Sequence, residues 1–404
     1  MNHAQHGALA DLTIVECAEE ISGPYCGKLL ADLGAEVIKI ERPGHGDAAR
    51  RRGPFYHDDP SPDTSLLFSY LNTNKLGITL DVSAPLGKEL LHRLLQQADV
   101  FLFGGAVAGM TSLGLEYATL RRINPTLVGV YITPFCLSGP YAGRRGGELV
   151  SFHMSALGLV TPGEKELARD RPPLKVGGHQ ALMITGLTAA TATLHALFAR
   201  EASREGQQVD VSELEPLTSF QFMDMARWVY AGNPGIRGTR DVGRQIACKD
   251  GSVAFLFGQD HMWHSWVEVM GKPAWAMNPA YQTRAGRTQH QEVIWAGIEA
   301  WAAAHTKEDI YRAGQGRRVP VFPYNTVAEA VTSVQVQSRG FLKAIPLASG
   351  IPVEAPSAPY QFSRTPWRLR RAAPLPGQHN HEIFCGRLGL APEALVAAYE
   401  AGVV

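Results

Sequence analysis

The 404-residue chain has no excess of either charge. Its 38 Lys and Arg residues equal its 38 Asp and Glu residues. A chain without net charge has no long-range field that would attract nucleic acid or an anionic membrane surface. We therefore expect neither of these partners, and any anionic ligand has to be held by local groups.

Cysteine is scarce, and metal-binding motifs are missing. The five cysteines are widely spaced and include no CxxC pair, which argues against a disulfide framework and against a thiolate zinc site. The 14 histidines include no HExxH motif, and the spacing of His261 and His264 is that of a helix surface. We expect no metal.

Long apolar runs and nucleotide-binding loops are also absent. The apolar stretches stop short of the roughly 18 to 20 residues that a membrane helix needs, and the first residues carry no basic stretch followed by an apolar one. We expect no membrane segment and a cytoplasmic location. The turn Ala18–Pro24 (AEEISGP) has no GxGxxG pattern, which disfavours NAD, and neither GxxxxGK[ST] nor GxSxG occurs.

Strand and helix patterns alternate along the first half of the chain. Apolar strand patterns occur at Leu12–Glu16, Glu36–Ile40, Gly77–Leu80, Val100–Phe103 and Thr126–Thr133, with helical patterns near 23–33, 85–97 and 115–122. Such alternation predicts an α/β fold with a mostly parallel sheet between layers of helices. Residues 181–202 are apolar on nearly every side, which predicts a core helix buried all round.

The composition changes after about Arg227, where Trp, Gly and His become frequent. Since a single core rarely grows past roughly 250 to 300 residues, we expect two domains. Residues 1–227 should form the N-terminal part of a large domain and residues 228–325 a smaller α+β domain. Residues 326–404 should return to the large domain.

Cationic and amide side chains lie at predicted strand ends. Arg42 follows one strand, and Asn72, Asn74 and Lys75 precede the strand at 77–80. Open α/β sheets bind ligands in crevices at strand ends, and Arg and Lys are suited to phosphate. Solvated surface charge is the alternative interpretation.

Several longer strings occur together in this chain, and they read GPYCGKLLADLGAEVIKIERPGHGDAAR, LNTNKLGITLDV, SGPYAG, ALFAREASREGQQVDVSELE and GKPAWAMNPAYQTRAGR. In order and spacing, and with the C-terminal GQHNHEIF and GVV, they resemble the family III CoA-transferases (CaiB/BaiF). The resemblance implies a Rossmann-like large domain, a smaller domain, two subunits interlocked as rings, and a coenzyme A thioester as substrate. Arg42, Asn72, Asn74 and Lys75 match the family's pattern and are expected to contact CoA.

One departure from the family bears on catalysis. The family uses an Asp at the head of the long apolar helix to attack the thioester, four residues before a glycine. Here Gly186 is that glycine, so Leu182 takes the place of the Asp, and leucine has no lone pair with which to attack. The resemblance therefore implies a non-catalytic subunit of a heteromeric enzyme, whose partner is a homologous subunit that carries the Asp. Such heteromers move CoA from succinyl-CoA to dicarboxylic acids such as (R)-benzylsuccinate.

Two other interpretations stay open. In the first, Glu148 or His179 replaces the nucleophile in a homodimeric transferase or an acyl-CoA isomerase, although Glu148 also suits a helix N-terminus and His179 a structural role. The second is a non-enzymatic scaffold or acyl-CoA-binding protein. Gly104–Ala108 also stands where the family carries a different loop at the nucleotide end of CoA, which weakens the expectation of CoA binding.

Overall fold

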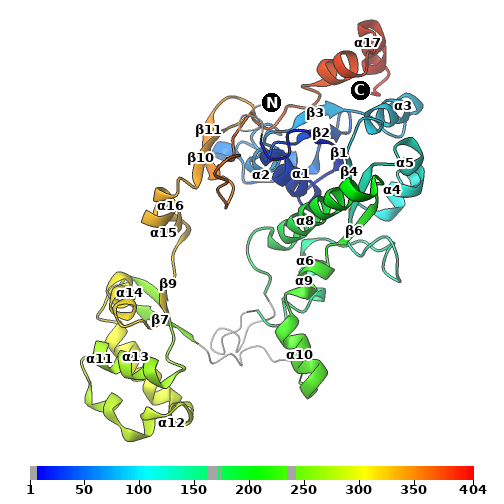
Figure 1. Ribbon diagram of the computed structural model, residues 1–404. Coiled ribbons are helices and arrows are strands. Elements are labelled where there is room, and N and C mark those ends of the chain that lie inside the picture. The colour runs from blue at the N-terminus through cyan, green and yellow to red at the C-terminus, as the bar shows by residue number, and fades with distance from the viewer. Residues whose placement is uncertain (1–6, 162–171, 173, 234–242) are drawn as a thin grey trace. The chain divides into compact units, whose positions relative to one another are not determined.

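The computed structural model describes residues 7–161, 172, 174–233 and 243–404 (Figure 1). The chain divides into two compact units. The large unit is drawn from Met1–Gly158, Lys175–Asn233 and Arg339–Val404, and the small unit from Leu159–Leu174 and Pro234–Ser338. The unit boundaries near 234 and 338 lie later in the chain than the expected 228 and 325.

A six-stranded parallel sheet forms the centre of the large unit, in the order β3-β2-β1-β4-β5-β6. This is the doubly wound order of the Rossmann fold, in which successive strands are added outward on one side of β1 and then, from β4 onward, on its other side. The strand order therefore reverses between β1 and β4, while all strands stay parallel. The strands are β1 (Thr13–Ala18), β2 (Glu36–Glu41), β3 (Leu76–Thr79), β4 (Val100–Gly104), β5 (Val128–Thr133) and β6 (Gln208–Ser212). The predicted α/β class with a mostly parallel sheet is confirmed, and the expected strand ends differ by one or two residues.

The described α-helices of the large unit are α1 (Ser22–Asp32), α2 (Leu66–Leu71), α3 (Pro85–Leu95), α4 (Val107–Leu113), α5 (Tyr117–Ile123), α6 (Glu148–Met154), α8 (Gln180–Ser203), α9 (Glu215–Ser219), α10 (Phe222–Ala231) and α17 (Pro392–Glu400). Several of them cover the two faces of this sheet, whereas α10 buries none of its residues. On one face, α1 and α8 lie side by side and bury Ile14 and Val100 (Figure 1). On the other, α3 and α5 bury Ile38 and Phe101. Covered on both faces, the central strands β4 (VFLFG) and β5 (VGVYIT) are almost continuously apolar.

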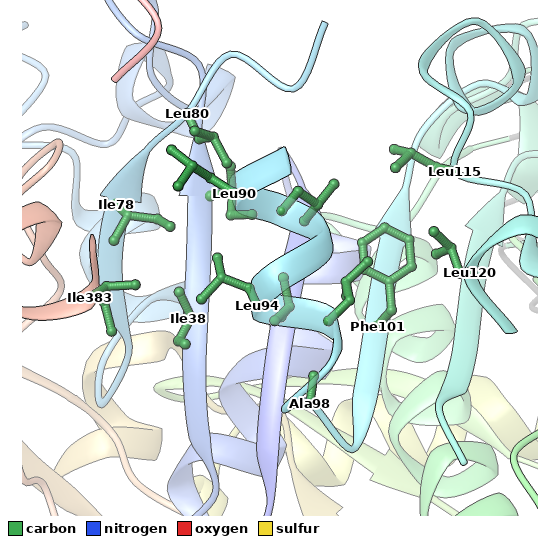
Figure 2. Packing of buried hydrophobic residues seen from close by; sticks show 14 of the residues in the cluster. Ile38, Ile78, Leu80, Leu90, Leu94, Ala98, Phe101, Leu115, Leu120 and Ile383 are labelled. Carbon is green, nitrogen blue, oxygen red and sulfur yellow. The ribbon is translucent and has the colours of Figure 1, made fainter. Parts of the chain in front are cut away.

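The C-terminal segment completes the second of these faces. It contains a hairpin of β10 (Leu342–Pro346) and β11 (Pro352–Pro356), and the π-helix η6 (His381–Arg387). Ile383 and Phe384 of η6 are buried against the sheet, and Figure 2 shows Ile383 beside Ile78 and Ile38. The backbone carbonyl of Val403 accepts a 2.7 Å hydrogen bond from the Asp81 N–H, directly after β3.

Helix α8 departs from the expectation of a helix buried all round. One face is buried, and Gly186 lies so close to α1 that an added Cβ would be 2.5 Å from the Ser22 carbonyl oxygen. The opposite face exposes 53% of Leu187 and 77% of Phe198. By length and composition, α8 is also the one described helix that could cross a membrane, contrary to the expected lack of such a stretch. Half of that stretch is buried in the unit, and core helices pass the same test.

The small unit combines an antiparallel sheet with helices, as expected for an α+β part. Its described strands are β7 (Arg244–Cys248), β8 (Gly251–Phe255) and β9 (Val321–Pro323), and its α-helices are α11 (Asp260–Val269), α12 (Arg284–Gln289), α13 (Gln291–Ala302), α14 (Lys307–Gly316), α15 (Val327–Thr332) and α16 (Val334–Ser338). Trp263 and Trp266 are fully buried in its core. His264 lies 2.9 Å from the Gln282 side-chain oxygen, and the described residues contain no group of three metal-ligating side chains.

Candidate functional site

A cavity of about 960 Å³ lies within the large unit at the carboxyl edge of the parallel sheet. Ala18 at the end of β1 and Gly104 at the end of β4 line it, so it lies where the strand order reverses, which is where doubly wound sheets bind ligands. Residues after β2 and β3 and the first turn of α8 complete its lining.

Small residues bring the backbones together at this reversal point. A Cβ added to Gly23, in the first turn of α1, would lie 2.3 Å from the Ala18 Cβ, and one added to Gly104 would lie 2.9 Å from it. Any side chain at either position would therefore push α1 or β4 away from β1. Gly104, Gly105 and Ala106, which replace the family's usual loop, line the cavity directly.

Three exposed arginines line the cavity. Arg42 follows β2, and Arg144 and Arg145 lie in the loop between β5 and α6. The Arg144 guanidinium also stacks over the Tyr141 ring, at 4.3 Å from the ring centre. Guanidinium groups present several donors in a fixed plane and bind phosphate in pairs of hydrogen bonds, so this edge is suited to a phosphorylated ligand.

Asn72, Asn74 and Lys75 do not line the cavity, although they were expected to bind the ligand together with Arg42. All three are buried. The Lys75 ammonium is 2.8 Å from a carboxylate oxygen of Glu16, and the Asn74 amide donates to Asp32 at 2.7 Å. In this structure their polar atoms serve the interior of the large unit. Distant residues pair with Asn74 and Lys75, while Asn72 bonds to the Phe68 carbonyl and to Lys75.

Lys75 belongs to a buried ionic network beneath the sheet edge. Glu16 lies between Lys75 and Lys39, and Lys39 in turn is 2.7 Å from a carboxylate oxygen of Asp47. Burial is the largest influence on Lys75 and lowers its pKa to about 8. Burial opposes the charge of Lys39 as well, but there the neighbouring Asp47 and Glu16 raise the pKa.

Leu182 lies in the first turn of α8 and lines the cavity. Its side chain is 5% exposed and packs with Ile21, Leu67 and Leu71 in a small apolar cluster. The side chain at the position of the family's Asp thus faces the ligand cavity and is hydrocarbon.

Glu148 begins α6 and caps the neighbouring helix α8. Its two carboxylate oxygens accept hydrogen bonds from the backbone N–H groups of Ala181 at 3.2 Å and Leu182 at 3.0 Å. Lys175 lies 3.5 Å away. A negative charge is favoured there, because the first N–H groups of a helix have no partner within the helix. His179 precedes α8 and makes no side-chain cap, and neither it nor Glu148 lines the cavity.

Glu213 supplies a carboxyl group to the same cavity as Leu182. It directly follows β6, and its backbone N–H donates to the Thr133 carbonyl at 2.9 Å. The Ser151 hydroxyl donates to its carboxylate at 3.4 Å. Burial, with the nearby charges of Glu20 and Glu148, raises the pKa of Glu213 to about 7, against the lowering influence of Ser151.

Comparison with known proteins identifies the family. The family model described as CoA-transferase family III matches residues 9–380. The chain belongs to this family. It is 30% identical to a succinate–glutarate CoA-transferase of Agrobacterium fabrum, across 93% of this chain and 94% of the relative.

Other members of CoA-transferase family III support the assignment. The succinyl-CoA:(R)-benzylsuccinate CoA-transferase subunit BbsE of Thauera aromatica is 30% identical over 92% of this chain and 93% of its own length. The crystal structure of a CaiB/BaiF family protein from Brucella suis superposes with a TM-score of 0.83 at 28% identity, covering 95% of this chain and all of that one.

Sequence reasoning missed two features of this family III site. The first is the pair Arg144 and Arg145, although adjacent arginines among glycines after a strand are a detectable pattern for an anion site. The second is Glu213. Its position directly after a β-strand of a parallel sheet is what would have indicated the cavity, because such positions collect at one sheet edge.

Proposed function

We propose that this chain is the subunit without a nucleophile in a heteromeric CoA-transferase that moves CoA from succinyl-CoA to a dicarboxylic acid. The observation that carries the proposal is Leu182, which presents hydrocarbon to the cavity at the head of α8. Because BbsE is a subunit of a transferase that acts on (R)-benzylsuccinate, this acid is the acceptor to test first.

The covalent route requires a carboxylate that attacks the thioester carbonyl and releases CoA as the leaving thiolate. Leu182 cannot do this. Glu148 directs both carboxylate oxygens to N–H groups of α8, and His179 lies outside the cavity lining. The geometry therefore argues against the homodimeric alternative in which Glu148 or His179 acts as the nucleophile.

Exposed apolar surface supports an obligate partner. None of the residues of α10 is buried, and Trp228, Val229 and Tyr230 on this helix are 60%, 69% and 89% exposed. Contiguous apolar surface of this kind marks protein interfaces. We assign it to a homologous subunit that carries the Asp, in the interlocked ring arrangement that the family resemblance implies.

The arginines of the cavity suit the phosphates of a CoA thioester. Arg42, Arg144 and Arg145 are exposed and line one cavity, so a phosphorylated ligand can neutralise their charges. Its binding breaks no internal ion pair, because the buried carboxylates of Glu41 and Glu16 are paired with Arg50 and Lys75 instead. In this proposal the chain contributes part of a CoA pocket while the partner supplies the nucleophile.

The test is CoA transfer from succinyl-CoA to (R)-benzylsuccinate by this chain alone, by an Asp-bearing homologue alone, and by the two co-expressed. We expect transfer only in the co-expressed complex, with the covalent adduct on the homologue in mass spectra. A homologue with its Asp replaced by Ala is the control and should abolish transfer. Transfer by this chain alone would contradict the proposal, and CoA binding without transfer in any mixture would favour an acyl-CoA-binding scaffold.

A further inference from the structure

The carboxyl group of Glu213 has no role in the reaction proposed above, yet it lines the same cavity as Leu182. Its backbone is fixed between β6 and β5 by the hydrogen bond to Thr133. Its side chain is half-buried and in hydrogen-bond reach of Ser151 on α6. The group is therefore a positioned part of the cavity wall.

Two carboxylates influence the ionisation of Glu213. Glu20 follows β1 and Glu148 begins α6, and both make ionisation of Glu213 less favourable. Arg144 and Arg145 line the same cavity from the loop before α6. Glu148 is engaged by the N-terminus of α8 and by Lys175 and does not line the cavity, so Glu213 rather than Glu148 presents a carboxyl group to a ligand there.

A protonated carboxyl donates a hydrogen bond, whereas an ionised one only accepts. The acyl part of any CoA-transferase ligand offers acceptor oxygens, either the carbonyl of a thioester or the carboxylate of a free acid. An ionised Glu213 would repel both, while the protonated form can bind either. The pKa near 7 makes the protonated form accessible at neutral pH.

We propose that Glu213 is a specificity-determining residue that binds the acyl oxygen of the cavity ligand as a carboxylic acid, by donating one hydrogen bond. The inference rests on the proposed function for the identity of the ligand. No covalent bond is made or broken. Above pH 7, ligand binding takes one proton from solution onto Glu213, and release of the ligand returns it.

Calorimetric titration of the full chain with succinate, and separately with acetyl-CoA, tests this. Succinate presents a carboxylate and acetyl-CoA a thioester carbonyl, so the two probes distinguish the two sources of acceptor oxygen. In buffers of different ionisation enthalpy at pH 8, we expect uptake of about one proton per ligand bound, and an affinity that falls about tenfold per pH unit above 7.

The variant Glu213→Gln keeps a hydrogen-bond donor that does not titrate. We expect it to bind with an affinity independent of pH and without proton uptake. Glu215→Gln, two residues away on the exposed side, should behave like the parent chain. Thermal unfolding of both variants checks that they are folded.

Proton uptake that persists in Glu213→Gln would overturn the inference, as would loss of binding in this variant at every pH, or no binding of either probe. The proton-uptake comparison and the transfer assay are separate measurements. A chain that transfers CoA without a partner would refute the silent-subunit assignment and would leave the proton-uptake comparison as decisive as before.

Discussion

Leu182 is the side chain on which the proposed function depends. It is buried with Ile21, Leu67 and Leu71 while its outer surface faces the cavity. The position lies at the N-terminus of α8, where a negative charge is favoured. A carboxylate placed there would meet both a ligand and a favourable helix terminus.

The variant Leu182→Asp should acquire a covalent succinyl or CoA adduct on this chain, measured by mass spectrometry in a complex whose partner nucleophile has been replaced. Removing the buried leucine should also lower the free energy of unfolding by about 2 to 5 kcal/mol. Leu182→Asn is the matched control, since it has the same shape and no carboxylate. Equal labelling of the Asn variant would contradict the prediction.

Glu148 is predicted to act on stability. Replacing it by Gln removes the charge that accepts from the N–H groups of Ala181 and Leu182, which should cost about 1 kcal/mol in urea unfolding. Glu201→Gln is the control, at an exposed position on α8, the helix that Glu148 caps. It should change the free energy of unfolding by less than about 0.5 kcal/mol. Equal effects of the two substitutions would argue against a capping role.

Residue identity alone did not predict which side chains line the cavity. Asn72, Asn74 and Lys75 have the side chains of a phosphate site, and the sequence places them beside a strand end. The sequence does not reveal that Asp32 accepts from Asn74 and Glu16 from Lys75 inside the unit, across more than forty residues. Arg42 is exposed, and it does line the cavity.

At the scale of elements, β1 to β5 were predictable because each contains a short stretch rich in apolar residues and bounded by turn residues. The edge strand β6 (QVDVS) is more polar. Helix α8 was predicted as a helix but not with its two different faces, because Leu187 and Phe198 are as apolar as the residues of its buried face. The presence of an apolar residue in the sequence does not indicate whether its own chain or another chain buries it.

Helix α10 provides an element-scale prediction. Replacing Trp228 and Tyr230 by Lys should weaken association with the partner at least tenfold in sedimentation velocity, since exposed aromatic residues commonly anchor interfaces. The unfolding midpoint of the isolated chain should barely change, because no residue of α10 is buried. Tyr399→Lys on α17 removes an equally exposed aromatic, at 71%, and should leave association intact. Unchanged affinity of the double variant would exclude α10 from the interface.

At the scale of the whole molecule, the two units have separate cores. Phe384→Ala should lower the stability of the large unit by about 3 to 5 kcal/mol, since Phe384 is fully buried against the sheet. Five tryptophans report on the small unit, namely Trp263, Trp266, Trp275, Trp295 and Trp301. The far-UV circular dichroism transition should therefore move to lower denaturant while the main fluorescence transition stays.

Phe362→Ala is the control for this experiment, because Phe362 is 44% exposed in the same C-terminal part of the chain. It should move neither transition appreciably. A Phe384→Ala variant in which both transitions move by the same amount would show that the units unfold as one.

The position of η6 and α17 also has a consequence for synthesis on the ribosome. All six strands of the parallel sheet are translated by residue 212, but the segment that covers Ile38 and Ile78 is translated last, after the entire small unit. A nascent or prematurely terminated chain that ends before η6 therefore lacks part of the cover over this apolar face, which α3 and α5 cover only in part. Exposed apolar surface of this kind is what chaperones and proteases recognise, so a chain truncated before η6 should be a better protease substrate than one translated through η6 and α17.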